Sequence, residues 1–467
     1  MMKRIVLPLA AIVVAGMILL FVLSSTTALR VDPPVRVVGT ETPVRLQASN
    51  PHGIRRVTAW IEQDGQQHQV FEKAEPATRF FFFGRNEPAR EITFSVGTKD
   101  APSVKDGKAR LIIETTANDF RGATDRVVSD VEINTRPPVL TADGHQHYIN
   151  QGGSELVTFT VSGYWTEAGV RVGKHTFRSF PVPGKDESSG ERFSLFAFPW
   201  DTPADIVPVV YARNPSGAET TARFWFKLFP KKFRSRELPL NDAFLQKVVN
   251  ELDPGGSGDL LSRYLKINGE MRRQNNETLA GLRHKTEQKV LWSGPFVQLS
   301  NSKVESLFAD TRSYMYNGRK VDEQTHLGFD LSVVKNVPVA ASNDGRVIYA
   351  APLGIYGNCV VIDHGYGLQS IYGHLNSIGV KPGEFVKKRQ EIGRSGETGL
   401  AGGDHLHFSM QVDGVQVNPI EWWDDHWIQD RILSKLTPIG GEVSHAHGTY
   451  TPKGSPTATA RPLGRAR

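Results

Sequence analysis

The sequence predicts a mainly β protein, made of two immunoglobulin-like β-sandwiches, a short helical linker and a C-terminal domain of antiparallel β-strands. Three observations support this fold class. Short runs rich in β-branched and aromatic residues are separated by Asn, Pro and Gly turns. A double proline recurs after 104 residues, and strand-like runs return from residue 290 after a helical stretch. At 467 residues, the chain is long enough for about three domains.

Residues 1–30 are predicted to be an N-terminal transmembrane anchor. Lys3 and Arg4 precede nineteen uncharged residues, Ile5 to Leu23, which reaches the roughly 17–25 residues needed to cross a bilayer. A cleavable signal peptide is the alternative, but its apolar core is shorter and a small-residue cleavage site follows it. We therefore expect a single-pass protein of the cell inner membrane, with the bulk of the chain on the extracytoplasmic, periplasmic side.

The first two folded domains are predicted at residues 32–136 and 137–230. Each begins at a double proline, and the spacing suits one immunoglobulin-like sandwich. A short internal repeat supports a duplication of the sandwich, because residues 117–123 and 212–218 share the pattern Ala-x-Asp/Asn-x-x-Gly-Ala. Asp or Asn followed by Gly at those positions is typical of a tight hairpin. A match this short can also arise by chance.

Residues 231–289 are predicted to form a basic joint and a helical linker. The first six residues of this segment include four Lys or Arg. Asn241 can cap a helix whose apolar positions, from Phe244 to Val249, have helical spacing. Glycines at 255–258 interrupt the pattern before a second helical stretch. Because few residues of that stretch are strongly apolar, we expect a hairpin or lever between domains.

The C-terminal β domain is predicted at residues 290–425, and a disordered tail at 440–467. Strand-like runs with glycine turns fill the first range, whereas the second is rich in Gly, Pro, Thr and Arg. The formal charge is +6, and no dense block of Lys or Arg indicates a nucleic-acid partner. The single cysteine, Cys359, allows no internal disulfide.

The candidate site residues all lie in the C-terminal domain. Of three His-x-His pairs in the chain, His405 and His407 are the pair in an apolar, strand-like run, where alternate side chains project to one face. His326, Asp330 and His374 lie on or beside other strands of the same region. Two histidines and a carboxylate suit a catalytic zinc with an open fourth position. Magnesium or calcium would require mostly oxygen ligands.

Five motifs in this region share an order and spacing with a known family. They are His326-x-x-x-Asp330, Tyr372-Gly373-His374-Leu375, Gly383-Glu384-x-Val386, Gly393-x-x-Gly396-x-Thr398-Gly399 and His405-Leu406-His407-Phe408. Together they resemble the zinc endopeptidases of the lysostaphin type, the M23 peptidases that cut peptidoglycan. The resemblance covers about residues 290 to 420 and implies a peptidase domain with an open groove. Gly402-Gly403-Asp404 departs from the small-residue-then-Pro run common in that family.

The resemblance also implies a role for each of five side chains. His326, Asp330 and His407 would be the zinc ligands, His405 the general base and His374 the group that stabilises the oxyanion. The chemistry agrees with these roles, since zinc polarises a scissile carbonyl. A neutral imidazole titrates in the range needed to move a proton at neutral pH.

We therefore expect a membrane-anchored zinc metalloendopeptidase that hydrolyses the peptide cross-links of peptidoglycan. Its partners would be peptidoglycan peptides, the cytoplasmic membrane through the N-terminal helix, and envelope proteins on the sandwiches. One alternative is a non-catalytic cell-wall scaffold or an activator of peptidoglycan amidases that uses the same domain for binding. Another is a protease that processes surface proteins. Residues 300–324 are placed where a segment could cover the groove and hold the enzyme inactive.

Overall fold

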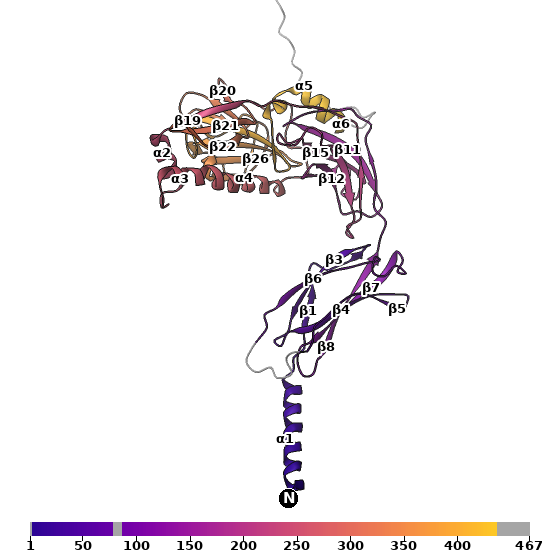
Figure 1. Ribbon diagram of the computed structural model, residues 1–467. Coiled ribbons are helices and arrows are strands. Elements are labelled where there is room, and N and C mark those ends of the chain that lie inside the picture. The colour runs from indigo at the N-terminus through magenta and orange to yellow at the C-terminus, as the bar shows by residue number, and fades with distance from the viewer. Residues whose placement is uncertain (1, 78–85, 437–467) are drawn as a thin grey trace, which may run out of the picture.

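The computed structural model describes residues 2–77 and 86–436 and shows a mainly β chain, which confirms the predicted fold class (Figure 1). α1 (Met2–Leu23) leads into a first β-sandwich, and a second β-sandwich lies beside the C-terminal domain. Within the described residues, no helix is both long enough and apolar enough to cross a membrane. The N-terminal anchor stays a prediction. The predicted tail at 440–467 lies outside the described residues.

The first sandwich packs a three-stranded sheet against a five-stranded sheet. Buried and exposed positions alternate along β3 (Thr42–Ser49), which places Val44 and Leu46 in the core with Ile61 and Leu111 of the larger sheet. The small sheet has the order β1 (Ala28–Val31), β3, β6 (Arg90–Val96). The large sheet has the order β2 (Val37–Val38), β8 (Thr124–Ile133), β7 (Gly107–Ala117), β4 (Ile54–Gln63), β5 (Gln66–Ala74).

The second sandwich packs two four-stranded sheets around a core that includes Phe177 and Phe196, one from each sheet. Its sheets have the orders β14 (Phe180–Pro181), β15 (Glu191–Ala197), β11 (Ser154–Ser162), β9 (Val139–Ala142) and β13 (His175–Arg178), β12 (Glu167–Val172), β16 (Val209–Arg213), β17 (Glu219–Ala222). A separate parallel ribbon joins β10 (His147–Asn150) to β18 (Phe226–Phe229). The immunoglobulin-like class of both sandwiches stays a prediction.

The C-terminal domain is built on an eight-stranded sheet. Its strands follow the order β20 (Lys303–Ser306), β23 (Phe329–Ser332), β31 (His405–Val412), β27 (Leu368–Leu375), β26 (Asn358–Asp363), β25 (Gly345–Pro352), β29 (Phe385–Val386), and β32 (Val415–Val417) pairs with β31. A small sheet joins β24 (Pro338–Ala340), β30 (Glu391–Arg394) and β28 (Ser377–Ile378). A third sheet joins β19 (Ser235–Leu240), β21 (Asp310–Tyr316) and β22 (Arg319–His326).

The segment predicted to be a linker is packed onto this domain. It contains β19, α2 (Asp242–Leu252), α3 (Leu260–Lys266) and α4 (Arg272–Gly281). The Asn241 side chain caps α2 as expected, since its Oδ1 accepts a hydrogen bond from the Phe244 amide at 2.9 Å. The helices bury their apolar side chains against Cys359 and Val361 of β26, while the alternate residue Val360 faces the opposite core. β26 is apolar on both faces and therefore needs this helical cover. The segment is thus a packed part of the domain and not a lever between domains.

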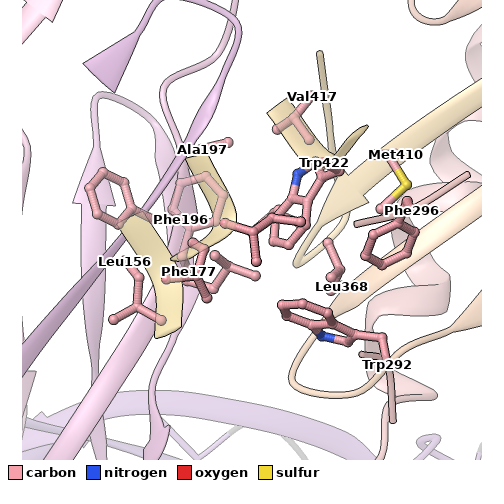
Figure 2. Close-up of a cluster of buried hydrophobic side chains, with 14 of the residues drawn as sticks. Leu156, Phe177, Phe196, Ala197, Trp292, Phe296, Leu368, Met410, Val417 and Trp422 are labelled. Atoms are coloured by element: carbon pink, nitrogen blue, oxygen red, sulfur yellow. The ribbon is translucent and has the colours of Figure 1, made fainter. Parts of the chain in front are cut away.

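The second sandwich and the C-terminal domain share one hydrophobic core. Figure 2 shows Phe196 and Phe177 of the sandwich in the same buried cluster as Trp422, Leu368 and Met410 of the C-terminal domain. Contacts of this kind across a boundary hold two domains in a fixed relation when the interface is large and apolar. The two predicted domains therefore form one packed body.

Polar contacts cross the same interface. Glu421, in the helical segment after β32, accepts hydrogen bonds from Asn150 Nδ2 and from the Ser154 amide, both at 2.8 Å. Arg178 of the sandwich binds Asp413 of the C-terminal domain through its amide and its Nε, each at 2.8 Å. Burial raises the pKa of Glu421 to about 7, although the bonds from Asn150 and Ser154 oppose the rise. The protonation of this carboxyl is therefore linked to the docking of the sandwich.

We predict that Glu421 makes stability depend on pH. The pKa of Glu421 in the folded protein lies above its ordinary value of 4.5. The stability that its protonated carboxyl contributes is therefore complete below about pH 4.5 and is lost as the pH rises through about 7. The loss is on the order of 3 kcal/mol at most. A Glu421→Gln variant should therefore show a smaller fall in melting temperature between pH 5 and pH 8 than the wild type.

The control for this experiment is Glu237→Gln, which removes an exposed carboxylate. It should keep the pH dependence of the wild type. Differential scanning calorimetry at several pH values measures all three proteins. An undiminished fall in the Glu421→Gln protein would contradict the prediction.

Candidate metal centre

Strand pairing brings the parts of the site together. β23 and β31 are antiparallel neighbours, and Asp330 lies directly opposite His407 in their register. Because side chains alternate faces along a strand, His405 projects to the same side of the sheet as His407. His326 is the last residue of β22 and lies four positions before Asp330. Residues far apart in the sequence thus meet on one face of the sheet.

The three predicted metal ligands converge on a single point. Asp330 Oδ1 lies 2.9 Å from His326 Nε2 and 3.2 Å from His407 Nδ1, and the two histidine nitrogens are 3.0 Å apart. All three ligand atoms lie within 4.8 Å of one another, and all three residues are buried. Two nitrogens and one carboxylate oxygen form the donor set of a catalytic site with one open position.

The protonation states also fit a bound metal, which requires neutral imidazoles and an ionised carboxylate. Burial lowers the pKa of His326 to about 4, even though the charge of Asp330 opposes this. Burial likewise lowers the pKa of His407. For Asp330 burial acts in the opposite direction, but His326 and the hydrogen bonds of the site hold its pKa well below the usual value.

Hydrogen bonds on the outer side of each imidazole fix its tautomer. His326 Nδ1 donates to the Leu307 carbonyl at 3.1 Å, which leaves Nε2 free toward the site. The Ser409 hydroxyl donates to the Leu327 carbonyl. The Ser409 oxygen, 3.2 Å from His407 Nε2, can therefore accept the proton of that nitrogen. Such outer partners orient metal ligands and raise their basicity.

Arg312 is a site residue that the sequence did not reveal. It lies on β21, and its guanidinium donates to Asp330 Oδ2 at 2.5 Å, on the side away from the histidines. This contact directs Asp330 Oδ1 toward the ligand cluster. No family motif includes Arg312, whose position depends on the hairpin that pairs β21 with β22. The Asn317-Gly318 turn could have predicted that hairpin from the sequence.

His405 and His374 lie next to the ligands, with their ring centroids 4.8 Å apart. Each can donate its Nδ1 proton to a backbone carbonyl at 2.8 Å, that of Gly403 for His405 and that of Thr398 for His374. In each ring Nε2 is then an acceptor while the ring is neutral and a donor once it is protonated. Both imidazoles are suited to moving a proton.

The pKa values of these two histidines shift in opposite directions. Burial acts to lower the pKa of His405, but its contact with Asp330 prevails and raises it. Burial, with His405 and His407 nearby, moves the pKa of His374 well below the usual value. These directions favour a neutral His374 and a cationic His405, the reverse of the roles implied by the resemblance. A bound cation changes the field on both rings, so the division of roles stays a prediction.

A cavity of about 690 Å³ opens beside Asp330 and His405. Its walls include Arg236 from β19 and the glycines Gly402 and Gly403 from the loop before β31. A Cβ atom added at either glycine would meet nothing within 4 Å, so this loop leaves space along the cavity. The cavity is an open space that reaches Asp330 and His405.

The segment 300–324 does not form a separate cover over this cavity. β20 extends the large sheet beside β23, and β21 and β22 form a hairpin. Tyr314 is buried in the core beneath the helices, and the Tyr316 hydroxyl donates to Asp242 at 2.7 Å. Arg312 is the side chain of this segment that binds a ligand residue. Lys303 to Ser306 and Arg312 line the cavity, so this segment helps to build its wall. Its inhibitory role stays a prediction.

A buried His/Asp/His cluster with two further histidines defines a class of metal-dependent hydrolases. The particular family follows from comparison with known proteins, since residues 324–419 match the model of Peptidase family M23. The chain therefore contains an M23 peptidase domain. This range includes all five predicted site residues, whereas Arg312 lies outside it.

Curated relatives match part of the chain. A metalloprotease of Haemophilus influenzae is 38% identical over 122 residues, which are 26% of this chain and 25% of that protein. The peptidoglycan DD-endopeptidase ShyA of Vibrio cholerae is 41% identical over 96 residues, 21% of this chain and 22% of that protein. The chain thus spans about a quarter of the length of these relatives. A solved zinc-containing peptidase from Vibrio cholerae has 16% identity and a TM-score of 0.26, with 67% of this chain and 81% of that chain covered.

We predict that Ser409→Ala weakens metal binding by about 10–100-fold, because His407 loses the partner that orients it. The matched control is Ser370→Ala on the neighbouring strand, where the buried hydroxyl contacts His364 and Tyr372 and no ligand. Competition with a chromophoric chelator measures the affinity of each variant. Equal affinities of the two variants would show that the Ser409 contact does not support the ligand.

Proposed function

We propose that this protein is a zinc metalloendopeptidase that hydrolyses the peptide cross-links of peptidoglycan in the cell envelope. The observation that carries this proposal is the convergence of His326, Asp330 and His407, with His405 and His374 beside them, next to a cavity of about 690 Å³. The named activity of a relative, a peptidoglycan DD-endopeptidase, supports the choice of substrate.

Zinc is the metal that suits this donor set best, because borderline-soft Zn²⁺ accepts imidazole nitrogen and carboxylate oxygen in a site with an open position. His326, Asp330 and His407 would hold it. When bound there, zinc supplies positive charge that polarises the scissile carbonyl. The remaining steps depend on side chains of the chain itself.

The two other histidines supply the proton transfers of peptide hydrolysis. A neutral imidazole accepts a proton from the attacking water at Nε2 and returns it to the leaving amine. The protonated partner donates a hydrogen bond to the carbonyl oxygen as negative charge develops on it, a contact that forms fully in the transition state. His405 and His374 are adjacent, and the Nδ1 atom of each contacts a backbone carbonyl, which leaves Nε2 to exchange the proton. The Nε2 atom of His405 also lies 3.4 Å from Asp330 Oδ1.

A non-catalytic scaffold would use the same domain for binding alone. The ligand set of this chain is complete, buried and supported by outer hydrogen bonds. Burying polar and charged groups in this way is costly unless they are paired or hold a metal. The arrangement therefore favours catalysis. We assign the sandwiches to spacing and to partner binding around the peptidase domain.

We predict that the two histidines of β31 differ in their effect on zinc and on rate. His407→Ala should lose both the bound zinc and the activity, because it removes a ligand. His405→Ala should keep about one zinc per chain and lose roughly 10²–10⁴-fold in rate, the usual contribution of a positioned acid or base. His426→Ala, at a side chain that is 86% exposed, is the control and should change neither.

Metal analysis and mass spectrometry of fragments from defined cross-linked muropeptides measure these outcomes. The fragments also identify the bond that is cut. A wild-type protein that carries zinc but releases no fragment from any of these substrates would overturn the proposed function. Loss of zinc from His405→Ala would show that His405 is a ligand.

A further inference from the structure

An exposed aromatic patch lies on the second sandwich, far in sequence from the metal ligands. It is formed by Tyr148 on β10, by Trp225 just before β18, and by Phe229 at the end of β18. Trp225 is 48% exposed and Phe229 41% exposed. The alternate residues Phe226 and Leu228 pack against the core, so the outward direction of the patch follows from the strand alternation. We call these three residues the aromatic patch.

The rings of the aromatic patch contact one another. Tyr148 lies between the other two, with its ring centroid 5.3 Å from that of Trp225 and 6.2 Å from that of Phe229. Its ring is within 17° of parallel to that of Phe229. Tyr148 is half-buried while Trp225 and Phe229 are exposed, so the three rings form one contiguous aromatic surface that is open to a partner.

Cations are interleaved with the rings. Lys227 pairs with Tyr148 in the strand register, and its Nζ lies 5.4 Å from the centroid of Phe229. The Arg431 guanidinium lies 4.8 Å from the centroid of Tyr148. In the described part of the chain, neither cation has an ion-pair partner. Their N–H groups are therefore hydrogen-bond donors at the edge of an apolar surface.

This combination is suited to a sugar chain. A pyranose ring presents C–H groups that pack on an aromatic face, while its hydroxyl and acetamido oxygens accept hydrogen bonds. The three rings provide the first kind of contact, and Lys227 and Arg431 provide the second. Aromatic and cationic side chains also occur together at protein interfaces and at membrane surfaces, so the choice of a sugar chain depends on the proposed function, and a lipid surface is one outcome of the test.

We propose that the aromatic patch binds the glycan strand of peptidoglycan. The choice of this polymer rests on the proposed function, since the peptides that the metal centre would cut are attached to that glycan. The shared core and the Glu421 contacts hold the patch in a fixed relation to the peptidase domain. Binding of the glycan therefore raises the local concentration of attached peptides at the cavity.

The test compares Trp225→Ala/Phe229→Ala with a matched control, Tyr164→Ala. Tyr164 is on the same sandwich and 42% exposed. Isothermal titration calorimetry with peptide-free glycan strands measures binding by the full-length protein. The double variant should bind about tenfold or more weakly than wild type, the loss expected when central aromatic contacts are removed. Tyr164→Ala should bind as the wild type does.

Two activity measurements separate the patch from the metal centre. The double variant should cleave intact sacculi more slowly than wild type, yet cleave a small soluble muropeptide at the wild-type rate. Equal glycan affinity in the double variant and the wild type would overturn the glycan site. So would a double variant that keeps its glycan affinity but no longer binds phosphatidylglycerol-containing vesicles, because the patch would then face lipid.

The proposed function and this inference fail in different ways. If the wild type binds glycan through the patch but cleaves no muropeptide, the peptidase proposal is wrong and the glycan site stands. If muropeptides are cleaved and the patch variants bind glycan normally, the glycan site is wrong and the peptidase proposal stands.

Discussion

The antiparallel register between β23 and β31 is the constraint on which the site depends. It places Asp330 opposite His407, and a slip of one residue would move every side chain of β31 to the other face. The apolar side of β31 prevents that slip, because Leu406, Phe408 and Met410 are buried in the core shared with the second sandwich. The position of the ligands is thus set by hydrophobic packing on the side of the strand that carries no chemistry.

Much of the site could be predicted from the sequence, because short sequence patterns identify most of its residues. The alternation around His405 and His407 indicated a strand with two imidazoles on one face, and the spacing from His326 to Asp330 matched a family motif. The fold class was accessible for the same reason, since turn residues and short apolar runs are local signals. What these patterns could not supply was the position of one segment relative to another.

The features that were missed all depend on contacts between distant segments. Arg312 reaches Asp330 because a hairpin aligns β21 with β22. Asn317-Gly318 between the two strands is a hairpin signal in the sequence, but it does not show that the hairpin lies against Asp330. The helices at 242–281 looked weakly apolar and were expected to link domains, yet their few apolar residues suffice to cover β26. Tyr314 and Tyr316 were placed near the groove by their sequence position, whereas strand pairing directs them to the helices.

The shared core of the second sandwich and the peptidase domain determines which parts of the chain unfold together. Length and turn patterns divide the chain into three domains, but side chains such as Phe196 and Trp422 belong to a single buried cluster. Residues that share a core tend to unfold together. Among the described residues, the cooperative units are therefore two, the first sandwich and everything after it. A peptidase domain cut out at its family boundary would expose Tyr366, which now packs against Phe180 and Phe193 of the sandwich.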